Sequence, residues 1–437
     1  LPATGWEETA VLAAAMADDA EGFVRGLMGA NLALAGRCAN DPEVRPRLGK
    51  AFVDELRWAL VARSRDPEAD LRARIAAGLE LGWLGDPRFE RRMGPFGAYL
   101  APPMVEIPGG VYPIGEDEPI EWSFRGGSGI EASHMPRHTV AVAGFQIGAY
   151  PVTNAEYACF MAAGGYEEDR WWDTEAGRAW RRGDLANEGA KSNNRTWRQR
   201  FIAQPQLFDQ MVDDGLFSSS EVLDRWRRWM KLTDAEFEIA LDEQWIAKRA
   251  TEPVYWRDPR FNHPAQPVVG ISWYEARAYA AWLSEQTGQA FRLPTEVELE
   301  AAMRGPAGRQ FAYGDAFDPA RGNTYETRVK HPSPVGVFVD GNTENGASDL
   351  AGNISAWTSS NWGKGVDAPT FKYPYDAADG REDAVAPPDT RRVVRGGSWV
   401  SPSDLARAAY RYGLIPGHRG YVVGVRLAVS APISVKH

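Results

Sequence analysis

Apolar residues recur at helical spacing through the first part of the chain, over residues 6–38, 41–64 and 67–84. Asp-Pro pairs at 41–42, 66–67 and 86–87 interrupt the pattern. Because proline lacks an amide N–H and suits the first turn of a helix, each pair predicts that one helix ends and another begins. The pattern therefore predicts a small all-α domain over residues 1–95, similar to one unit of a helical-repeat array, with a Gly- and Pro-rich junction at 94–103.

The pattern changes after this junction. In residues 104–115, β-branched and aromatic residues flank Pro-Gly-Gly, which predicts a strand, a turn and a second strand. Residues 138–153 alternate apolar with small residues, which also predicts a strand. Three Ser/Thr-x-x-Glu capping boxes follow, each at the start of a helical stretch: Thr153–Glu156, Ser272–Glu275 and Thr295–Glu298. Each side chain of such a box binds an otherwise unpaired N–H at the start of the helix, so each box predicts a helix start. Residues 305–430 are short strand-like runs among Gly, Asn, Pro and Ser. Few helices and many loops predict an α+β fold with an irregular antiparallel sheet.

The middle of the chain, about 165–262, is rich in tryptophan; Trp171, Trp172, Trp180, Trp197, Trp226, Trp229, Trp245 and Trp256 lie there. A tryptophan-lined ligand cleft is one interpretation. We favour the other, in which loops and two extra helices, at 219–231 and 233–248, pack onto the domain through large aromatic side chains.

Charge and composition narrow the classes of partner. The formal net charge is −10, so broad affinity for nucleic acid is not expected, and a protein or a small ligand is the expected partner. No apolar run is long enough to cross a bilayer, and no signal-peptide pattern opens the chain. The two cysteines, Cys38 and Cys159, lie in apolar helical stretches and cannot make a disulfide framework, which suits the cytoplasm.

Several strings carry a family resemblance. EIPGG, YPVTN, QPVVGISWYEA, RLPTEVELEAAMRG, PSPVG, DLAGNISAWTSS, RVVRGGSW and GVRL occur in the order found in the sulfatase-modifying-factor family. The chain is thus identified as similar to formylglycine-generating-enzyme-like domains. The resemblance implies a C-type-lectin-like fold over residues 102–432, with the tryptophan-rich stretch as an insert.

The resemblance also implies which residues a catalytic member needs. Members that make formylglycine use two cysteines near the C-terminal end, which bind copper and take part in redox turnover. Here that segment reads RGGSWVSPSDLARAAYR and holds no cysteine, while Cys38 and Cys159 lie far upstream. We therefore expect a binding protein and not an enzyme.

Two metal sites known in the family are incomplete. The related sulfoxide synthases bind iron partly through an HxxxHxE string; His134 and His138 match the histidine spacing, but Val140 replaces the acid. The family often binds calcium near GNVWEW; here the string is GNISAW, with Ala356 in place of the acid, so that Asn353 and carbonyl groups form at most a weakened site. We expect no metal and no other cofactor.

The C-terminal segment resembles the variable region of proteins encoded by diversity-generating retroelements, which is displayed on this same fold. Adenines are mutated in such regions, so that AAC codons become NNC codons, which encode no Trp, Met, Lys, Glu or Gln. None of these five residue types occurs in residues 400–423. The variable region would span about 395–427. Tyr, Ser and Gly are favoured at adaptable contact surfaces.

In this segment, residues expected to hold the backbone in place, which we call frame residues, alternate with residues expected to touch a ligand, which we call contact residues. The frame residues are Trp399, Arg407, Arg411, Arg419 and Arg426. The expected contact residues are Val400, Ser401, Leu405, Tyr410, Tyr412, Gly413, Leu414, His418, Gly420, Tyr421 and Val422. A second exposed loop is expected at Trp357, Ser359, Ser360 and Asn361.

The N-terminal helices resemble the tail of a signalling ATPase of the STAND/NACHT type, although the chain contains no GxxxxGK[ST] phosphate loop. An ATPase region is therefore expected upstream, unless the helices are a free-standing cap. We predict a ligand-binding protein with a diversified C-terminal surface. The alternatives are a non-variable sensor or accessory domain of such an ATPase, and a metal-dependent oxidase of the formylglycine-generating or sulfoxide-synthase type.

Overall fold

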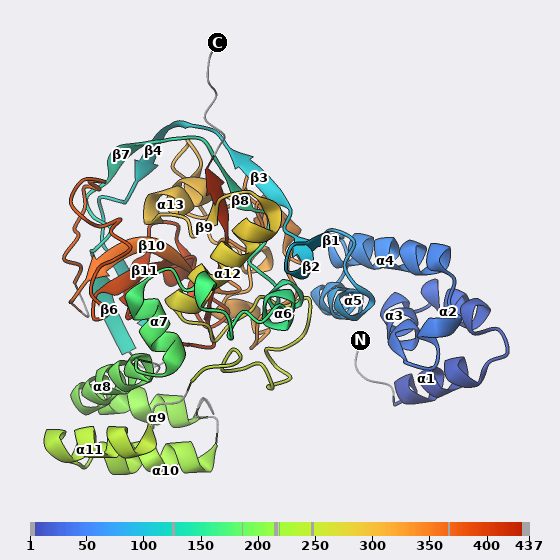
Figure 1. The fold of residues 1–437 in the computed structure, drawn as a ribbon, viewed down its shortest axis with the longest axis horizontal. Helices are drawn as coiled ribbons and strands as arrows, with labels where there is room; N and C mark the ends of the chain where they lie inside the picture. Colours follow the sequence, from blue (N-terminus) through green and yellow to red (C-terminus); the bar gives the residue numbers. More distant parts are fainter. Residues whose placement is uncertain are drawn as a thin grey trace.

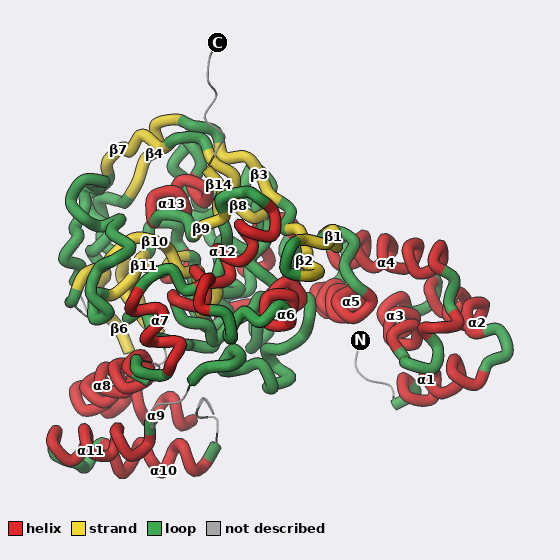
Figure 2. Tube along the Cα trace, in the orientation of Figure 1, coloured by secondary structure: helices red, strands yellow, loops and turns green. Residues whose placement is uncertain are grey.

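A helical domain extends from one side of a larger mixed domain (Figure 1). The computed structural model describes residues 5–430, apart from 125–126, 186, 214–216, 218, 246–248 and 366–367. The predicted α+β class with a preceding all-α region is confirmed. Loops join most of the elements of the larger domain (Figure 2). Among the described residues, no helix is long and apolar enough to cross a membrane.

The helical domain is built from α1 (Glu7–Met16), α2 (Ala20–Met28), α3 (Leu32–Asn40), α4 (Lys50–Ser64) and α5 (Leu71–Leu84). The continuous pattern predicted over residues 6–38 is split into three helices. Asp19 and Asn31 cause the splits, because their side chains accept hydrogen bonds from Gly22 N–H and Leu34 N–H and so cap α2 and α3.

Residues 90–101, which overlap the predicted junction at 94–103, form a hairpin of β1 (Glu90–Gly94) and β2 (Gly97–Ala101). The helical domain therefore ends before residue 95. Gly97 makes the turn with a φ of +98°, a conformation that glycine adopts without strain. Tyr99 on β2 is buried in the main core, which fixes the hairpin to the larger domain.

Helix α5 docks closely against the larger domain. A Cβ at Gly78 would lie 2.8 Å from Pro334 Cβ, and a Cβ at Gly82 would lie 2.8 Å from Ala265. Trp83 packs edge-on against His263, with ring centroids 5.1 Å apart. The two glycines, one helical turn apart, allow the helix backbone to approach the neighbouring loops.

The strands form two four-stranded sheets and several ribbons. One sheet has the order β12-β11-β10-β13, and the other has the order β3-β8-β14-β9. All pairs are antiparallel except β10 with β13. Two-stranded ribbons pair β4 with β7 and β5 with β6. The bounds are β3 Met104–Ile107, β4 Gly110–Ile114, β5 Ile120–Phe124, β6 Gly127–Glu131, β7 His138–Val142, β8 Phe145–Gly148, β9 Phe291–Arg292, β10 Ser355–Gly363, β11 Arg391–Arg395, β12 Arg411–Leu414, β13 Val423–Gly424 and β14 Ala428–Ser430.

The three predicted capping boxes begin three helices, α6 (Asn154–Ala162), α12 (Trp273–Thr287) and α13 (Glu296–Arg304). Trp357 and Val394, which pair across β10 and β11, belong to the core that contains α12. Ala356, the next residue along β10, belongs to the core that contains α13. The central sheet therefore lies between these two helices, one on each face.

The tryptophan-rich insert contains α7 (Glu175–Arg182), α8 (Glu188–Ala203), α9 (Pro205–Asp213), α10 (Ser220–Trp229) and α11 (Asp234–Gln244). The two predicted helices correspond to α10 and α11, while α7 to α9 were not predicted. Trp171, Trp172 and Trp180 are buried in the main core, and Trp226 and Trp229 form a separate core of the insert. These tryptophans pack in hydrophobic cores and anchor the insert, so they do not line a ligand cleft.

Short 3₁₀ turns complete the secondary structure, at Arg45–Arg47, Asp169–Trp171, Pro319–Arg321, Tyr325–Thr327, Val339–Gly341 and Ser403–Ala406.

Candidate binding surface

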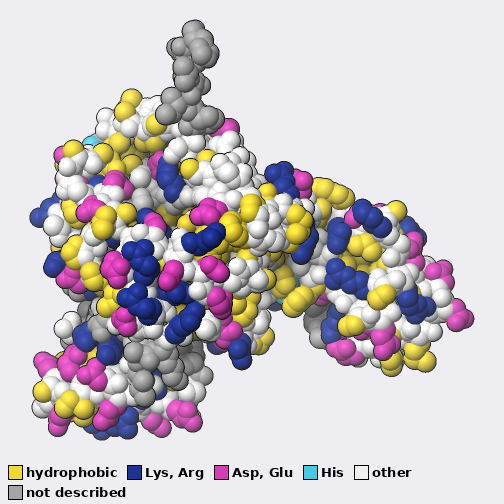
Figure 3. All heavy atoms as spheres, in the orientation of Figure 1, with side chains coloured by type: hydrophobic (Ala, Val, Ile, Leu, Met, Phe, Trp, Pro, Cys, Tyr) yellow, Lys and Arg dark blue, Asp and Glu magenta, His cyan; other side chains and the backbone are white. Residues whose placement is uncertain are grey.

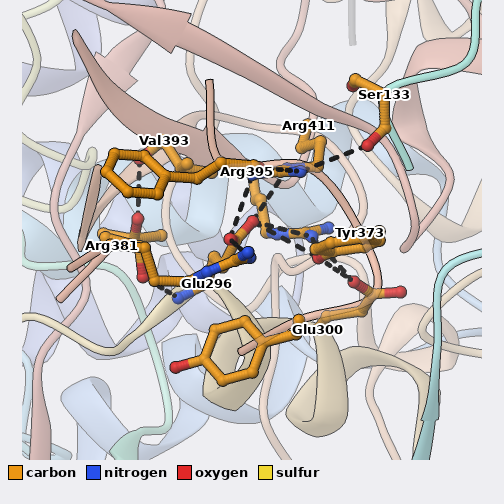
Figure 4. A network of polar contacts seen from close by, with 12 residues as sticks. Ser133, Glu296, Glu300, Tyr373, Arg381, Val393, Arg395 and Arg411 are labelled. Carbon is orange, nitrogen blue, oxygen red and sulfur yellow. Dashed lines mark hydrogen bonds and ion pairs between the residues drawn. The ribbon is translucent and has the colours of Figure 1, made fainter. Parts of the chain in front are cut away.

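A buried cluster of charges lies beneath the C-terminal segment (Figure 4). Glu296 and Glu300 are four residues apart on α13, so their carboxylates share one helix face. Glu296 accepts from Arg381 Nη1 at 3.2 Å and from Arg411 Nη2 at 3.0 Å, and Arg395 Nη2 lies 3.4 Å from its Oε2. All five side chains are at most 1% exposed.

Glu300 completes this cluster. Arg395 Nη2 lies 2.7 Å and Arg304 Nη1 lies 3.0 Å from its carboxylate, and Gly115 N–H donates to it at 2.7 Å. Burial raises the pKa of Glu300, but the two arginines and the Gly115 N–H outweigh that effect and leave the pKa below its usual value. The carboxylate is therefore charged and paired, as a buried charge must be to be tolerated. The sequence prediction did not include this cluster, although the four-residue spacing of Glu296 and Glu300 along the predicted helix was a usable signal.

Strand β12 connects this cluster to the surface. Arg411 points into it, whereas Tyr410, Tyr412 and Leu414 point to the other face of the sheet, because side chains alternate along a strand. Tyr410 and Tyr412 stack with ring centroids 5.6 Å apart. Burial raises the pKa of Tyr412 to about 12, so its phenol stays neutral near neutral pH and keeps its O–H donor.

Gly413 is misassigned as a contact residue. It is buried, and a Cβ at this position would lie 2.3 Å from Trp362 Cγ. Its carbonyl also accepts a hydrogen bond from Arg391 Nη1 at 3.2 Å. Gly413 is therefore part of the frame.

The other expected contact residues are partly accessible. Tyr421 is 37% exposed. Those that are half-buried are Val400, Ser401, Leu405, Tyr410, Tyr412, Leu414, His418, Gly420 and Val422. Tyr412, Leu414 and Val422 also pack against the main core. The segment presents a shallow, partly packed surface and not a fully protruding one.

Tyr421 lies in a group of four aromatic rings that we name the aromatic patch: Tyr255, Phe261, Trp399 and Tyr421. The ring centroid of Tyr421 is 5.6 Å from that of Trp399, 6.0 Å from that of Tyr255 and 6.2 Å from that of Phe261. Tyr255 and Phe261 come from the end of the insert and were not predicted as site residues. Trp399, predicted as frame, is partly buried and contributes its ring to this patch.

The four predicted frame arginines are held by the surrounding structure. Arg419 Nη2 donates to Glu275 Oε1 at 2.8 Å, and Arg426 Nη1 donates to the Gly148 carbonyl at 2.5 Å. Arg407 Nη1 lies 3.3 Å from Glu116 Oε2. With Arg411 in the charge cluster, these contacts attach the C-terminal segment to α12, β8, the loop after β4, and α13.

The second expected loop is wrong. Trp357, Ser359, Ser360 and Asn361 lie in β10, and all but Ser359 are buried. Trp357 Nε1 donates to the Ile271 carbonyl at 3.1 Å, and Ser360 Oγ donates to Glu382 Oε1 at 2.5 Å. The side chains of Ser359 and Ser360 both donate to Glu382, and Asn361 Nδ2 donates to the Gly380 and Asp383 carbonyls, so these polar side chains form hydrogen bonds instead of a loop.

Two of the residues that a family metal site would use, His138 and Asn353, form hydrogen bonds within the protein. His134 Nε2 donates to the Glu118 carbonyl at 3.0 Å, and its buried Nδ1 has no partner in the described part of the chain. His138 Nδ1 donates to the Pro136 carbonyl at 2.9 Å, and His138 Nε2 accepts from Tyr375 N–H at 2.8 Å, so both ring nitrogens are occupied. Asn353 Oδ1 accepts from Ser333 N–H at 2.9 Å and from Asn323 Nδ2 at 3.2 Å. These residues do not fit an iron pair or a calcium ligand as they stand.

The two cysteines also lie away from the C-terminal segment. Cys38 is buried in α3 and Cys159 is on α6. Burial raises the pKa of the Cys38 thiol to about 11, which disfavours the thiolate that would bind copper. The residues present do not fit the copper site of the thiol-dependent members.

Acid sensitivity is expected from two partly buried histidines. Burial lowers the pKa of His418 and that of His263 to about 4, against 6.5 for an ordinary histidine. The unfolded chain takes up these protons near pH 6.5 and the folded chain only near pH 4. Stability is therefore complete above pH 6.5 and falls toward pH 4, by at most about 1.4 kcal/mol per pH unit for each histidine. Urea unfolding of His418→Gln should show a shallower loss over this range; an unchanged slope would contradict the assignment.

Several known proteins are similar to this chain in sequence. The chain is 29% identical over 314 residues to a hercynine oxygenase of Mycolicibacterium thermoresistibile, covering 68% of this chain and 53% of that protein. It is 28% identical over 350 residues to the inactive C-alpha-formylglycine-generating enzyme 2 of Bos taurus, covering 75% and 88%. It is 28% identical over 358 residues to the formylglycine-generating enzyme of Streptomyces coelicolor, covering 76% and 90%. The chain thus spans only about half the length of the hercynine oxygenase.

Two solved structures are similar to this chain at low sequence identity. PvdO from Pseudomonas aeruginosa has a TM-score of 0.43 at 20% identity, covering 79% of this chain and 100% of that one. Treponema denticola variable protein 1 has a TM-score of 0.42 at 16% identity, with the same two coverages. The family described as "Sulfatase-modifying factor enzyme 1-like domain" matches residues 91–431. The chain therefore belongs to the sulfatase-modifying factor enzyme 1-like family.

Proposed function

We propose that this chain is a binding protein that contacts its ligand through the C-terminal segment, residues 399–422. The observation that supports it most is the alternation on β12. Arg411 is tied to the buried charges, while Tyr410 and Tyr412 remain partly accessible on the opposite face. A fixed backbone with adaptable aromatic side chains is the arrangement that contact surfaces use.

The finer proposal is that this segment is diversified, as in the variable proteins of diversity-generating retroelements. Substitutions at accessible positions usually change stability by about 0.5 kcal/mol or less, so such a surface can vary without unfolding the domain. A near-identical template repeat and a reverse transcriptase gene beside the coding sequence would support this proposal. Uniform sequence drift across residues 400–423 in close strains would contradict it.

A scan of all substitutions over residues 399–426, with the amount of folded protein on a cell surface as the measurement, tests the division into frame and contact residues. We expect Leu405, Tyr410 and Tyr421 to tolerate most residue types. We expect Arg411 and Gly413 to tolerate almost none, because one pairs a buried charge and the other adjoins Trp362. Equal tolerance at both sets would contradict the proposal.

The second candidate is an oxidase, which the likeness to hercynine oxygenase and formylglycine-generating enzyme favours. The contacts of His138 and the absence of cysteine from residues 400–423 argue against it. Metal analysis of the purified protein and a thiol-oxidation assay separate the two. Stoichiometric copper or iron together with turnover would replace the binding proposal.

For the helical domain, we propose attachment to an upstream signalling ATPase. The close docking of α5 against the larger domain through Gly78 and Gly82 supports a rigid connection between the helical domain and the larger domain. Isolating the complete gene product and testing it for ATP hydrolysis checks this proposal.

A further inference from the structure

Helix α5 lies where the helical domain meets the larger domain, at a neck that is narrower than either domain (Figure 3). Two loops of the larger domain lie against this helix, and we name them the docking loops: residues 262–266 and 332–337. A Cβ at Gly82 would lie 2.8 Å from Ala265 in the first loop, and a Cβ at Gly78 would lie 2.8 Å from Pro334 Cβ in the second. Because these contacts are already close, neither loop can shift without changing how α5 is held.

The two docking loops are bonded to each other. Val335 N–H donates to the Ala265 carbonyl at 2.9 Å, and Gln266 Nε2 donates to the Pro332 carbonyl at 2.6 Å. The Gln266 side chain is buried, so breaking its hydrogen bonds would leave an unsatisfied amide inside the protein, which costs about 1–3 kcal/mol. The two loops therefore form one platform beneath α5.

The first docking loop begins directly after Phe261, one of the four rings of the aromatic patch. Asn154 Nδ2 donates to the Phe261 carbonyl at 2.8 Å and to the His263 carbonyl at 2.9 Å. His263 in turn packs against Trp83 of α5. One buried amide group thus holds a residue of the patch and a residue in contact with α5 at a fixed spacing.

The second docking loop reaches Trp399, another ring of the patch, through Asn353. The side chain of Asn353 accepts from Ser333 N–H at 2.9 Å and donates to the Ser333 carbonyl at 3.3 Å. The Asn353 carbonyl accepts from Trp399 N–H at 3.1 Å. Asn353 is fully buried and has a φ of +64°, a conformation that persists only where surrounding contacts fix it. Asn353 alone therefore links Trp399 to the residue that precedes Pro334.

The patch is the adjustable end of these connections. Trp399 is half-buried, and its Nε1–H is buried without a hydrogen-bond partner in the described part of the chain. An unpaired buried donor costs about 1–3 kcal/mol, so a new orientation of the indole that pairs this N–H is favourable. Tyr421, whose ring centroid is 5.6 Å from that of Trp399, is exposed. A ligand that contacts Tyr421 therefore meets an indole whose hydrogen bonding is incomplete.

We propose that α5 senses whether the aromatic patch is occupied, because both docking loops tie the patch to this helix. A ligand on the patch changes how Phe261 and Trp399 are held, and the platform passes that change to Gly78 and Gly82. The ligand part of this inference rests on the proposed binding function, whereas the coupling itself is a property of the chain alone. Coupling between two sites is reciprocal, so a change at α5 must also alter the patch.

Gly78→Ala tests the coupling from the side of α5, with hydrogen–deuterium exchange of the full chain as the measurement. The added Cβ displaces Pro334, which directly follows Ser333. We expect exchange at the Ser333 and Trp399 amides to become at least about fivefold faster, the low end of typical coupling between two sites. Faster exchange confined to residues 332–337 would overturn the coupling.

Two controls accompany this variant. The Ala408 amide lies in the same C-terminal segment, donates to the Gln310 carbonyl at 2.8 Å and should exchange as before. Gly26→Ala adds a methyl group with nothing within 4 Å, and it should change exchange at none of these amides. If Gly78→Ala does not fold, Trp399→Ala tests the same connection from the side of the patch. It should speed exchange in α5, and unchanged exchange there would overturn the coupling.

A single-domain antibody whose binding requires Tyr421 serves as the probe that occupies the patch. We expect this antibody to slow exchange in α5 at least about fivefold, whereas an antibody against α8 to α11 should not. Coupling in the variants without this slowing would overturn the sensing role. The proposed function fails separately, because equal tolerance of frame and contact residues in the substitution scan would overturn it and leave the measured coupling intact.

Discussion

Replacing Glu296 with glutamine will lower the free energy of unfolding by about 3–5 kcal/mol, the range observed when one partner of a buried ion pair is removed. Glu296 is fully buried and contacts Arg381, Arg395 and Arg411. Without its charge, Arg411 loses its ion pair, whereas Arg381 keeps Asp379 and Arg395 keeps Glu300 as partners. Urea unfolding at neutral pH, with two-state behaviour checked by two probes, measures the loss.

Glu285→Gln is the control for this result. Glu285 lies on α12, is 51% exposed and is 3.6 Å from Arg170, an exposed pair that contributes at most about 1 kcal/mol. A Glu296→Gln protein as stable as the control would show that the cluster does not hold the frame. The Glu296→Gln substitution should also perturb the contact surface, because Arg411, which pairs with Glu296, lies on β12.

The second large effect is expected at Gly413. Replacing Gly413 with alanine will destabilise the protein by about 3 kcal/mol, because the added methyl group would overlap the indole of Trp362. Trp362 cannot move freely: its Nε1 donates to the Gly365 carbonyl at 3.0 Å, and its ring lies 5.1 Å from the guanidinium of Arg411. Thermal unfolding followed by near-ultraviolet circular dichroism reports both the stability and the indole environment.

Gly26→Ala makes the same chemical change with the opposite expected sign. Gly26 lies inside α2, and an added Cβ there meets nothing within 4 Å. Alanine in a helix interior is favoured over glycine by up to about 1 kcal/mol, so this variant should be slightly more stable. If both variants lost stability equally, the cost at Gly413 could not be assigned to Trp362.

Much of the frame could be predicted from the chain itself. The capping boxes at Thr153, Ser272 and Thr295 start α6, α12 and α13, because a cap depends only on residues three apart. The ordered strings predicted the family that residues 91–431 match.

Other features depend on residues far apart in the sequence. Glu296 meets arginines 85 to 115 positions away, and no local pattern reveals that these charges are buried together. Tyr255 and Phe261 join Tyr421 only because the end of the insert folds back onto the C-terminal segment.

The misassigned residues have the same cause. Gly413 and the polar residues of β10 resemble loop residues in composition, but a neighbouring indole and a carboxylate enclose them. The sequence by itself therefore determined the starts of α6, α12 and α13 and the family. Only the tertiary structure decided which of those side chains reach solvent, because burial depends on what packs from elsewhere in the chain.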